Sequence, residues 1–129
     1  MRNITQVLIV LAVFLAIRVY LTQGSIKSGP APVFAGELLD GATFQLDDFR
    51  GKPALIHFWA TWCKICAFND GSIDDLAKDR QVITVGMESG GKTEIGEDMK
   101  ERGLSFPVYV DSLGKLANSY LVKGVPTNY

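Results

Sequence analysis

Apolar runs alternate with segments of helical periodicity along most of the chain. Two long runs, KPALIHFWA (52–60) and QVITVGM (81–87), are typical of buried strands, and FPVYVD (106–111) predicts a third, shorter strand. Ahead of them, the pair Asp40-Gly41 between two short alternating runs predicts a hairpin. Since each long run is followed by a helical segment, the order predicts an α/β fold with a mainly parallel sheet flanked by helices.

The helical segments have different signals. Lys64–Asp79 carries apolar residues on one face, although the residues at 69–71, Asn-Asp-Gly, predict a kink or break inside it. Glu94–Arg102 has acidic residues early and basic residues late, and Gly103 is typical of a helix end. The third segment has apolar residues at helical positions i, i+3, i+4, i+7 and i+8, namely Leu113, Leu116, Ala117, Tyr120 and Leu121.

A separate apolar segment lies at the N-terminus. Its uncharged core, Val7–Ile17, has 11 residues, and the wider segment Ile4–Leu21 would form a helix of roughly 27 Å. That length is just enough to span a bilayer, so Ile4–Leu21 predicts a transmembrane anchor with Arg18 near one interface. The alternative is a cleaved signal peptide, since such a short core suits one, although no A-x-A-like cleavage site follows.

The pattern divides the chain into four parts. The segment TQGSIKSGPAP is small, polar and contains proline and glycine, which predicts a flexible linker. The remainder has the length of one small domain. The predicted parts are an N-terminal tail, an anchor, a linker and a globular domain, over residues 1–3, 4–21, 22–32 and 33–129.

Composition and charge narrow the chemistry. The net charge of −1 over 129 residues gives no basic field that would favour nucleic acid as a partner. Two cysteines and one histidine are too few for the usual structural zinc sites, and Ala67 follows Cys66 where haem attachment needs histidine. A disulfide that closes so short a loop stabilises a fold weakly, so the pair indicates chemistry rather than architecture.

The two cysteines stand at a strand-to-helix junction. Cys63 follows the first buried run and begins a helix, where the helix dipole and free N–H groups favour its thiolate form. Lys64 adds positive charge beside it. Cys66 lies one turn further along, so we expect it to be more buried and to act as the resolving thiol. A strand-CxxC-helix unit in an α/β chain predicts a redox site.

The segment FWATWCKIC, residues 58–66, resembles the active-site signature of the thioredoxin-like superfamily, and WATWC looks like its membrane-tethered TlpA/ResA-like branch. Two longer segments fit that branch: FQLDDFRGKPALIHFWATWC and DSLGKLANSYLVKGVPT. Two others are similar to periplasmic protein disulfide oxidoreductases related to suppressor for copper sensitivity protein D: GSIDDLAKDRQVITVGMESG and LSFPVYVD. The resemblance covers about Pro32–Thr127.

The resemblance implies a thioredoxin-like fold, a Cys63–Cys66 redox couple, and Pro126 as a cis-proline facing that couple. It also implies a redox domain on the periplasmic side of the bacterial inner membrane. The expected partners are client protein disulfides or thiols, and a thiol partner that exchanges electrons, such as a membrane reductase. No bound cofactor and no metal are needed for such exchange.

Three departures limit what the resemblance implies. The residues between the cysteines are Lys64 and Ile65, without the proline of many relatives, so the redox potential does not carry over. Asn69 stands where many TlpA/ResA-like members have glutamate. The sequence stops at GVPTNY, where the family fold continues. We therefore expect a fragment without the final strand and helix, whose sheet would have an unpaired edge and whose folding would be loose.

Other residues near the cysteines have two readings each. Trp62 is expected to shape the surface beside Cys63, whereas Trp59 is expected only to pack. His57, on the buried run, either relays protons for the second cysteine or is a hydrogen-bonded packing residue, and we favour packing. The remaining candidates are two acidic pairs read as solvated faces, Asp47-Asp48 and Asp74-Asp75, and two loop residues that could line the rim of the site, Glu88 and Lys92.

These observations predict a membrane-anchored thiol:disulfide oxidoreductase. Cys63 would attack a substrate disulfide, and Cys66 would resolve the mixed disulfide. One alternative is a redoxin-type thiol peroxidase, but Thr61 precedes Cys63 by two residues, where peroxidases usually have threonine at three. Another is a copper-binding module, because soft thiolates select Cu(I), although no methionine or histidine cluster accompanies the pair.

Overall fold

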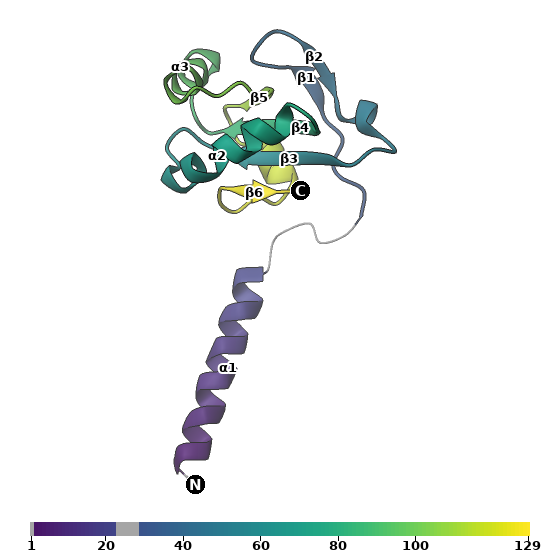
Figure 1. Ribbon diagram of the computed structural model, residues 1–129. Coiled ribbons are helices and arrows are strands. Elements are labelled where there is room, and N and C mark those ends of the chain that lie inside the picture. Colours follow the sequence, from purple (N-terminus) through teal and green to yellow (C-terminus); the bar gives the residue numbers. More distant parts are fainter. Residues whose placement is uncertain (1, 23–28) are drawn as a thin grey trace.

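A four-stranded sheet forms the centre of the protein in the computed structural model, which describes residues 2–22 and 29–129 (Figure 1). The strand order is β5-β4-β3-β6. β3 (Ala54–Trp59), β4 (Gln81–Met87) and β5 (Val108–Asp111) run parallel, and β6 (Thr127–Asn128) pairs antiparallel with β3. The three apolar runs are therefore the three parallel strands, and the predicted α/β fold with a mainly parallel sheet is confirmed.

Helices cover both faces of this sheet. Along β3, Ile56 and Phe58 point to one face and Trp59 points to the other, because side chains alternate along a strand. The face with Trp59 packs against α2 (Lys64–Ala77) and α3 (Lys92–Arg102), and the opposite face packs against α4 (Lys115–Ser119). In Figure 1, α2 lies across the near side of β3 and β4.

The predicted hairpin forms an appendage to the sheet. β1 (Ala35–Glu37) and β2 (Thr43–Gln45) pair antiparallel, and Gly41 in their turn has φ +88°, a conformation that favours glycine. A short 3-10 helix, Leu46–Phe49, follows β2. The N–H of Leu39 donates to Val108 O at 2.8 Å and thereby ties the hairpin to β5.

Two helices differ from their predicted course. α2 continues without a break through residues 69–71, where a kink or break was predicted, because tertiary contacts of Asp70 hold that turn against the sheet. α4 is only five residues long, so the two ends of the predicted apolar stripe, Leu113 and Leu121, lie exposed instead of in the core. α3 ends at Gly103, which has φ +66°, as its sequence predicted.

The N-terminal segment forms the helix α1 (Arg2–Thr22). Within residues 2–22 and 29–129, none of the helices combines the length and the apolarity needed to cross a membrane. The segment Ile4–Leu21, predicted as a transmembrane anchor, is helical. Most of the predicted linker lies outside the described residues.

The segment after Pro126 adds a strand to one side of the sheet. In β6, Thr127 and Asn128 pair with Phe58 and His57 of β3. Tyr129 exchanges two further backbone hydrogen bonds with Ile56, each 3.0 Å long. Over these residues β3 has a partner strand on both sides, and β6 is the outermost strand on this side of the four-stranded sheet. The expected fragment without a final strand and helix stays a prediction.

Candidate active site

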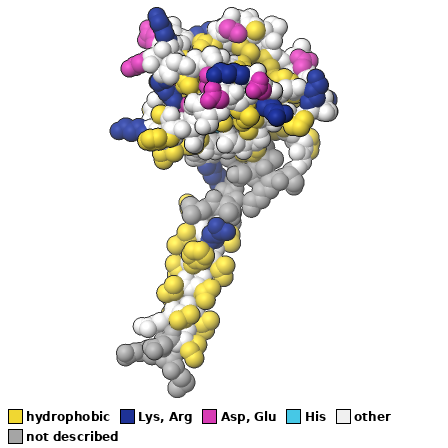
Figure 2. Space-filling view, in the orientation of Figure 1, with side chains coloured by type: hydrophobic (Ala, Val, Ile, Leu, Met, Phe, Trp, Pro, Cys, Tyr) yellow, Lys and Arg dark blue, Asp and Glu magenta, His cyan; other side chains and the backbone are white. Residues whose placement is uncertain are grey.

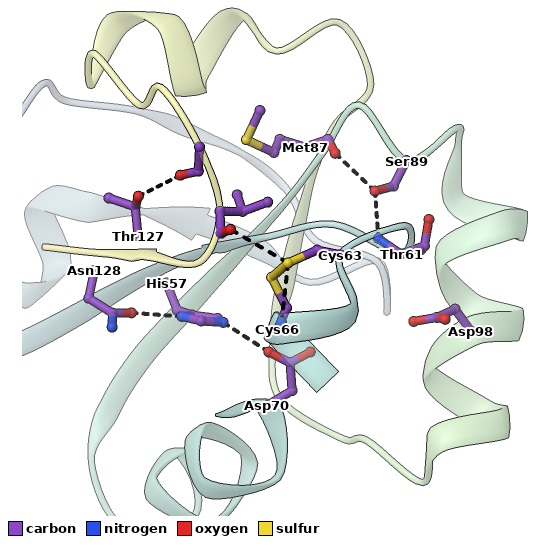
Figure 3. The surroundings of a disulfide bond; sticks show 12 residues. His57, Thr61, Cys63, Cys66, Asp70, Met87, Ser89, Asp98, Thr127 and Asn128 are labelled. Carbon is purple, nitrogen blue, oxygen red and sulfur yellow. Dashed lines mark hydrogen bonds and ion pairs between the residues drawn. A yellow bond between two sulfur atoms is a disulfide. The ribbon is translucent and has the colours of Figure 1, made fainter. Parts of the chain in front are cut away.

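Cys63 and Cys66 form a disulfide at the start of α2 (Figure 3). Cys63 is the N-cap of the helix, and its Sγ accepts a hydrogen bond from the Cys66 N–H at 3.1 Å. That N–H belongs to the first turn, where helix donors have no partner within the helix. The same donor would stabilise a thiolate at Cys63 once the disulfide is reduced.

Burial distinguishes the two sulfurs. Cys63 is 8% exposed and Cys66 is fully buried, so the predicted order of exposure is confirmed. A thiol of another protein can therefore reach only Cys63 without opening the fold.

Backbone contacts fix the turn that carries Cys63. The Cys63 N–H donates to Ala60 O at 3.1 Å, and the Thr61 N–H donates to Ser89 Oγ at 2.9 Å. The Ser89 hydroxyl in turn donates to Met87 O at 2.9 Å (Figure 3). The loop after β4 thus holds the turn after β3, and the position of Cys63 depends on two adjacent parallel strands.

The segment with Pro126 lies directly against the disulfide. The Val125–Pro126 peptide bond is cis, and Val125 O lies 3.6 Å from Cys63 Sγ. A sulfur in a disulfide has no hydrogen to donate, so this distance is a contact in the oxidised protein. In the reduced protein the Cys63 thiol could donate to the same carbonyl.

The surface around Cys63 is apolar. Trp62 is 59% exposed, and its indole N–H donates to Glu88 O at 3.0 Å. On the outer face of α2, Ile65 and Phe68 are 65% and 86% exposed. Trp62 therefore lies on the surface beside Cys63, as expected. Trp59, by contrast, is fully buried, which agrees with a packing role.

A groove of about 430 Å³ lies next to this surface. Trp62 and Glu88 form one part of its lining, and two lysines and Gly124 form another; the lysines are Lys115 and Lys123. Trp62 precedes Cys63 and Gly124 precedes Val125 in the sequence, so the groove begins beside the site, although neither cysteine lines it. Glu88 therefore lies near the site, whereas Lys92 forms an ion pair with Glu37 and is not part of this lining.

His57 is buried between two oxygen atoms on different elements. Its Nδ1 lies 2.7 Å from Asn128 Oδ1 on β6, and its Nε2 lies 3.0 Å from Asp70 Oδ1 on α2. Both His57 and Asp70 are fully buried. In the sequence Asp70 was noted only as part of a predicted helix break, although its place four residues after Cys66 puts it on the same face of a helix.

Arg102 of α3 completes this buried group. Its Nη2 pairs with Asp70 Oδ2, its Nη1 donates to Asp98 Oδ2 at 3.0 Å, and its guanidinium lies 5.6 Å from the centre of the Trp59 ring. Burial acts to lower the pKa of Arg102, but the hydrogen bonds to Asp70 and Asp98 outweigh it and raise that pKa above its ordinary value. Arg102 therefore stays charged beside Asp70.

The acidic pair at 74 and 75 was predicted to be a solvated face, and for Asp74 that is wrong. Asp74 is 8% exposed, and its Oδ1 accepts the N–H groups of Ser105 and Phe106 at 2.5 and 2.7 Å. It thus joins α2 to the segment that enters β5. Asp75 is exposed, as are Asp47 and Asp48.

No three histidine, cysteine, aspartate or glutamate side chains are grouped to hold a metal ion in the part of the chain that the structure describes. The chemistry that the site offers is thus that of an accessible sulfur, a buried sulfur and a buried hydrogen-bonded group behind them.

Comparison with protein families gives a match over most of the chain. The family model described as the AhpC/TSA family matches residues 28–129. The chain is 32% identical over 91 residues to a thioredoxin-like protein of Haemophilus influenzae, covering 69% of this chain and 54% of that protein. It is 34% identical over 105 residues to the thioredoxin-like protein YneN of Bacillus subtilis, covering 77% and 61%.

A third relative is the thiol-disulfide oxidoreductase ResA of Bacillus cereus, 32% identical over 104 residues, which cover 77% of this chain and 60% of ResA. The chain thus spans about half to three fifths of the length of these relatives.

Solved structures have the same fold. The exposed lipoprotein thioredoxin Etrx1 of Streptococcus pneumoniae superposes with a TM-score of 0.62 at 34% identity, over 75% of this chain and 78% of that one. A secreted Mycobacterium tuberculosis disulfide oxidoreductase homologous to Escherichia coli DsbE has a TM-score of 0.65 at 23% identity, over 74% and 72%. At that identity the second match shows the fold alone.

Proposed function

The chain belongs to the AhpC/TSA family, and from that premise we propose that it is a thiol:disulfide oxidoreductase acting on disulfides of client proteins. One observation carries the proposal. The two cysteines are bonded to each other at the N-terminus of α2, and Cys63 is 8% exposed whereas Cys66 is fully buried. A disulfide that only stabilises the fold does not require this difference in exposure between its two cysteines.

The proposed reaction is thiol–disulfide exchange in two steps. The Cys63 thiolate attacks a client disulfide, forms a mixed disulfide and releases one client thiolate, which takes up a proton. Cys66 then loses its proton and attacks Cys63 Sγ, which restores the Cys63–Cys66 bond and releases the second client thiol. Run in reverse, the same steps oxidise a client. Electrons come from, or go to, another thiol protein, such as a membrane reductase.

The surface around Cys63 supports a protein client. Trp62, Ile65 and Phe68 expose apolar area beside the reactive sulfur, and an adjacent groove is open to a polypeptide segment. Exposed apolar area of this kind commonly marks a site of protein contact.

We further propose that the redox domain works on the periplasmic side of the bacterial inner membrane, with α1 as the segment that targets it there and holds it at the membrane. The support is the apolar surface of α1, whose large apolar side chains are at least half exposed. They are the yellow side chains along the helix that extends from the globular part in Figure 2. A fusion of alkaline phosphatase to residue 129 should be active in cells. An inactive fusion with an active β-galactosidase counterpart would contradict this location.

The experiment for the activity is reduction of a protein disulfide by the full chain. With a thiol donor present, the parent should reduce insulin catalytically and Cys63→Ser should be inactive. Cys66→Ser should form mixed disulfides with clients that persist, because attack survives and resolution is lost. Hydrogen peroxide consumption without insulin reduction would indicate a thiol peroxidase instead. Stoichiometric Cu(I) binding without reductase activity would indicate a copper-binding module.

A further inference from the structure

The groove beside Cys63 carries charged side chains that the proposed exchange does not use. Its volume of about 430 Å³ is in the range of small-ligand sites, about 300–1,000 Å³. The lining includes one carboxylate and two ammonium groups, those of Glu88, Lys115 and Lys123. Met87 also lines the groove, and in Figure 3 it lies on the side of Cys63 opposite Asp70. The groove is therefore separate from the buried polar group behind the disulfide.

The carboxylate of Glu88 is held at a defined place in the groove. Glu88 has φ +47°, in the left-handed region that is unfavourable for a residue with a Cβ. Its N–H donates to Asp111 O at 3.0 Å, and its C=O accepts the Trp62 indole N–H at 3.0 Å. Its side chain lies against Gly114, where an added Cβ would come within 2.9 Å of Glu88 Oε1. Glycine would fit the backbone at position 88 better, so the backbone alone does not account for a carboxylate there.

The two lysines lie on different segments of the lining. Lys115 directly follows Gly114, against which the Glu88 carboxylate lies. Lys123 stands two residues before Val125, whose carbonyl contacts Cys63 Sγ. In the part of the chain that the structure describes, the ion pairs involve other side chains. One part of the groove thus offers a negative and a positive charge together, and the part that leads to the disulfide offers a positive charge.

This arrangement of charges complements a small peptide thiol. Glutathione has an amino-acid head with one carboxylate and one ammonium group, a second carboxylate at its glycyl end, and a thiol between the two ends. Three residues in extended form reach roughly 10 Å, so a thiol at Cys63 leaves the charged ends within reach of the groove. The ligand then carries two negative charges and one positive charge, and the groove carries the opposite set.

We propose that the groove binds glutathione, or a peptide thiol with the same three charged groups, as an electron-exchange partner of the Cys63–Cys66 couple. Lys115 and Lys123 contact the two carboxylates, and Glu88 contacts the ammonium group. This inference rests on the proposed thiol–disulfide exchange and names a small thiol that takes part in it.

The exchange balances with two molecules of glutathione. The first loses its thiol proton to solvent and attacks Cys63 Sγ as a thiolate, the Cys63–Cys66 bond breaks, and the Cys66 sulfur takes up a proton from solvent. The thiolate of the second then attacks the glutathione sulfur of the mixed disulfide and releases glutathione disulfide and the Cys63 thiolate. Two electrons pass to the couple, and the reverse sequence oxidises it.

The test measures an equilibrium in the full chain with Cys66→Ser, where a mixed disulfide at Cys63 persists. The protein is equilibrated with glutathione and glutathione disulfide in known ratios, and intact mass gives the fraction that carries glutathione. The same measurement with 2-mercaptoethanol and its disulfide gives the constant for an uncharged thiol. The glutathione constant should exceed the 2-mercaptoethanol constant by about 3–30-fold at low ionic strength, and this ratio should fall as salt is added.

Removal of single charges in the same background tests the contacts. Lys115→Gln and Lys123→Gln should each lower the ratio of the two constants by about 2–5-fold. Glu88→Gln should also lower it, but should have no effect when glutathione is replaced by glutaryl-cysteinylglycine, which lacks only the amine. The matched control is Lys100→Gln, which alters an exposed lysine of α3 outside the groove and should leave the ratio as in Cys66→Ser.

The outcomes separate this proposal from the proposed function. Equal constants for the two thiols, unchanged by the lysine substitutions, would overturn the glutathione site. A higher glutathione constant in Glu88→Gln would also overturn it, because the groove would then select anions alone, as an acidic segment of a client protein requires. Absence of a mixed disulfide at Cys63 with either reagent would instead contradict the proposed function, so the two failures are distinguishable.

Discussion

Asp74 provides a sharp test of how α2 is fixed to the sheet. Its Oδ1 accepts the N–H groups of Ser105 and Phe106, which lead into β5. In Asp74→Ala both donors lose their acceptor. The Ser105 N–H is close to solvent and can bond to water, whereas Phe106 is 3% exposed and its N–H would be left without a partner.

The magnitude follows from these two environments. Loss of the Ser105 hydrogen bond should cost about 1 kcal/mol, and the unsatisfied Phe106 N–H about 1–3 kcal/mol more. The sum, about 2–4 kcal/mol, is a large part of a typical total stability of about 5–15 kcal/mol. Asp74→Asn retains an acceptor oxygen and loses only the charge, so it should cost about 1 kcal/mol.

The assay is denaturant unfolding of the oxidised full chain, followed by tryptophan fluorescence. Trp59 is a suitable reporter, because its ring centre lies 5.5 Å from that of Phe106. The control is Asp75→Ala, which removes a carboxylate that is 77% exposed and pairs with Lys78, and which should change stability by no more than about 0.5 kcal/mol. If Asp74→Ala and Asp75→Ala lower the unfolding midpoint equally, the reasoning is refuted.

Three further predictions concern single sites. Gly103→Ala should destabilise the fold by about 1 kcal/mol, because Gly103 has φ +66°. Gly96→Ala inside α3, where an added Cβ would meet open space, should stabilise the fold by about 0.5–1 kcal/mol. Chemical denaturation should show the two changes in stability with opposite signs. Burial, with a smaller contribution from Tyr129, raises the pKa of Tyr120 to about 12. The folded state thus binds the Tyr120 proton more tightly than the unfolded state does. The resulting contribution to the free energy of unfolding is complete below pH 10, is lost between about pH 10 and 12, and amounts to at most about 2–3 kcal/mol. Unfolding measurements should show that Tyr120→Phe loses less stability than the parent between about pH 10 and 12. Phe68→Ser should weaken turnover of a protein client but leave the reaction with a small aromatic disulfide unchanged; equal effects on both would argue against client contact at this exposed side chain.

Some features of the fold depend on local sequence alone. The runs that became β3, β4 and β5 are continuous and apolar because helices cover both faces of the parallel part of the sheet. Gly41 and Gly103 adopt positive φ values that other residues disfavour. The glycine at each position was therefore enough to predict a turn and a helix end. The CxxC pair was placed at a helix start because the apolar strand pattern ends there and the helical pattern begins.

The neighbours of the buried polar groups could not be predicted in this way. His57 bonds to Asn128, 71 residues away, and to Asp70, 13 residues away, and no local pattern records such pairs. Asp74 and Asp75 are chemically identical neighbours, yet one is buried and the other exposed, because successive helical residues point about 100° apart. The sequence by itself thus determined the three parallel strands, the hairpin and the place of the cysteine pair at a helix start. Only the tertiary structure decided which charges are removed from water and what they contact, since that depends on how helices rotate against the sheet.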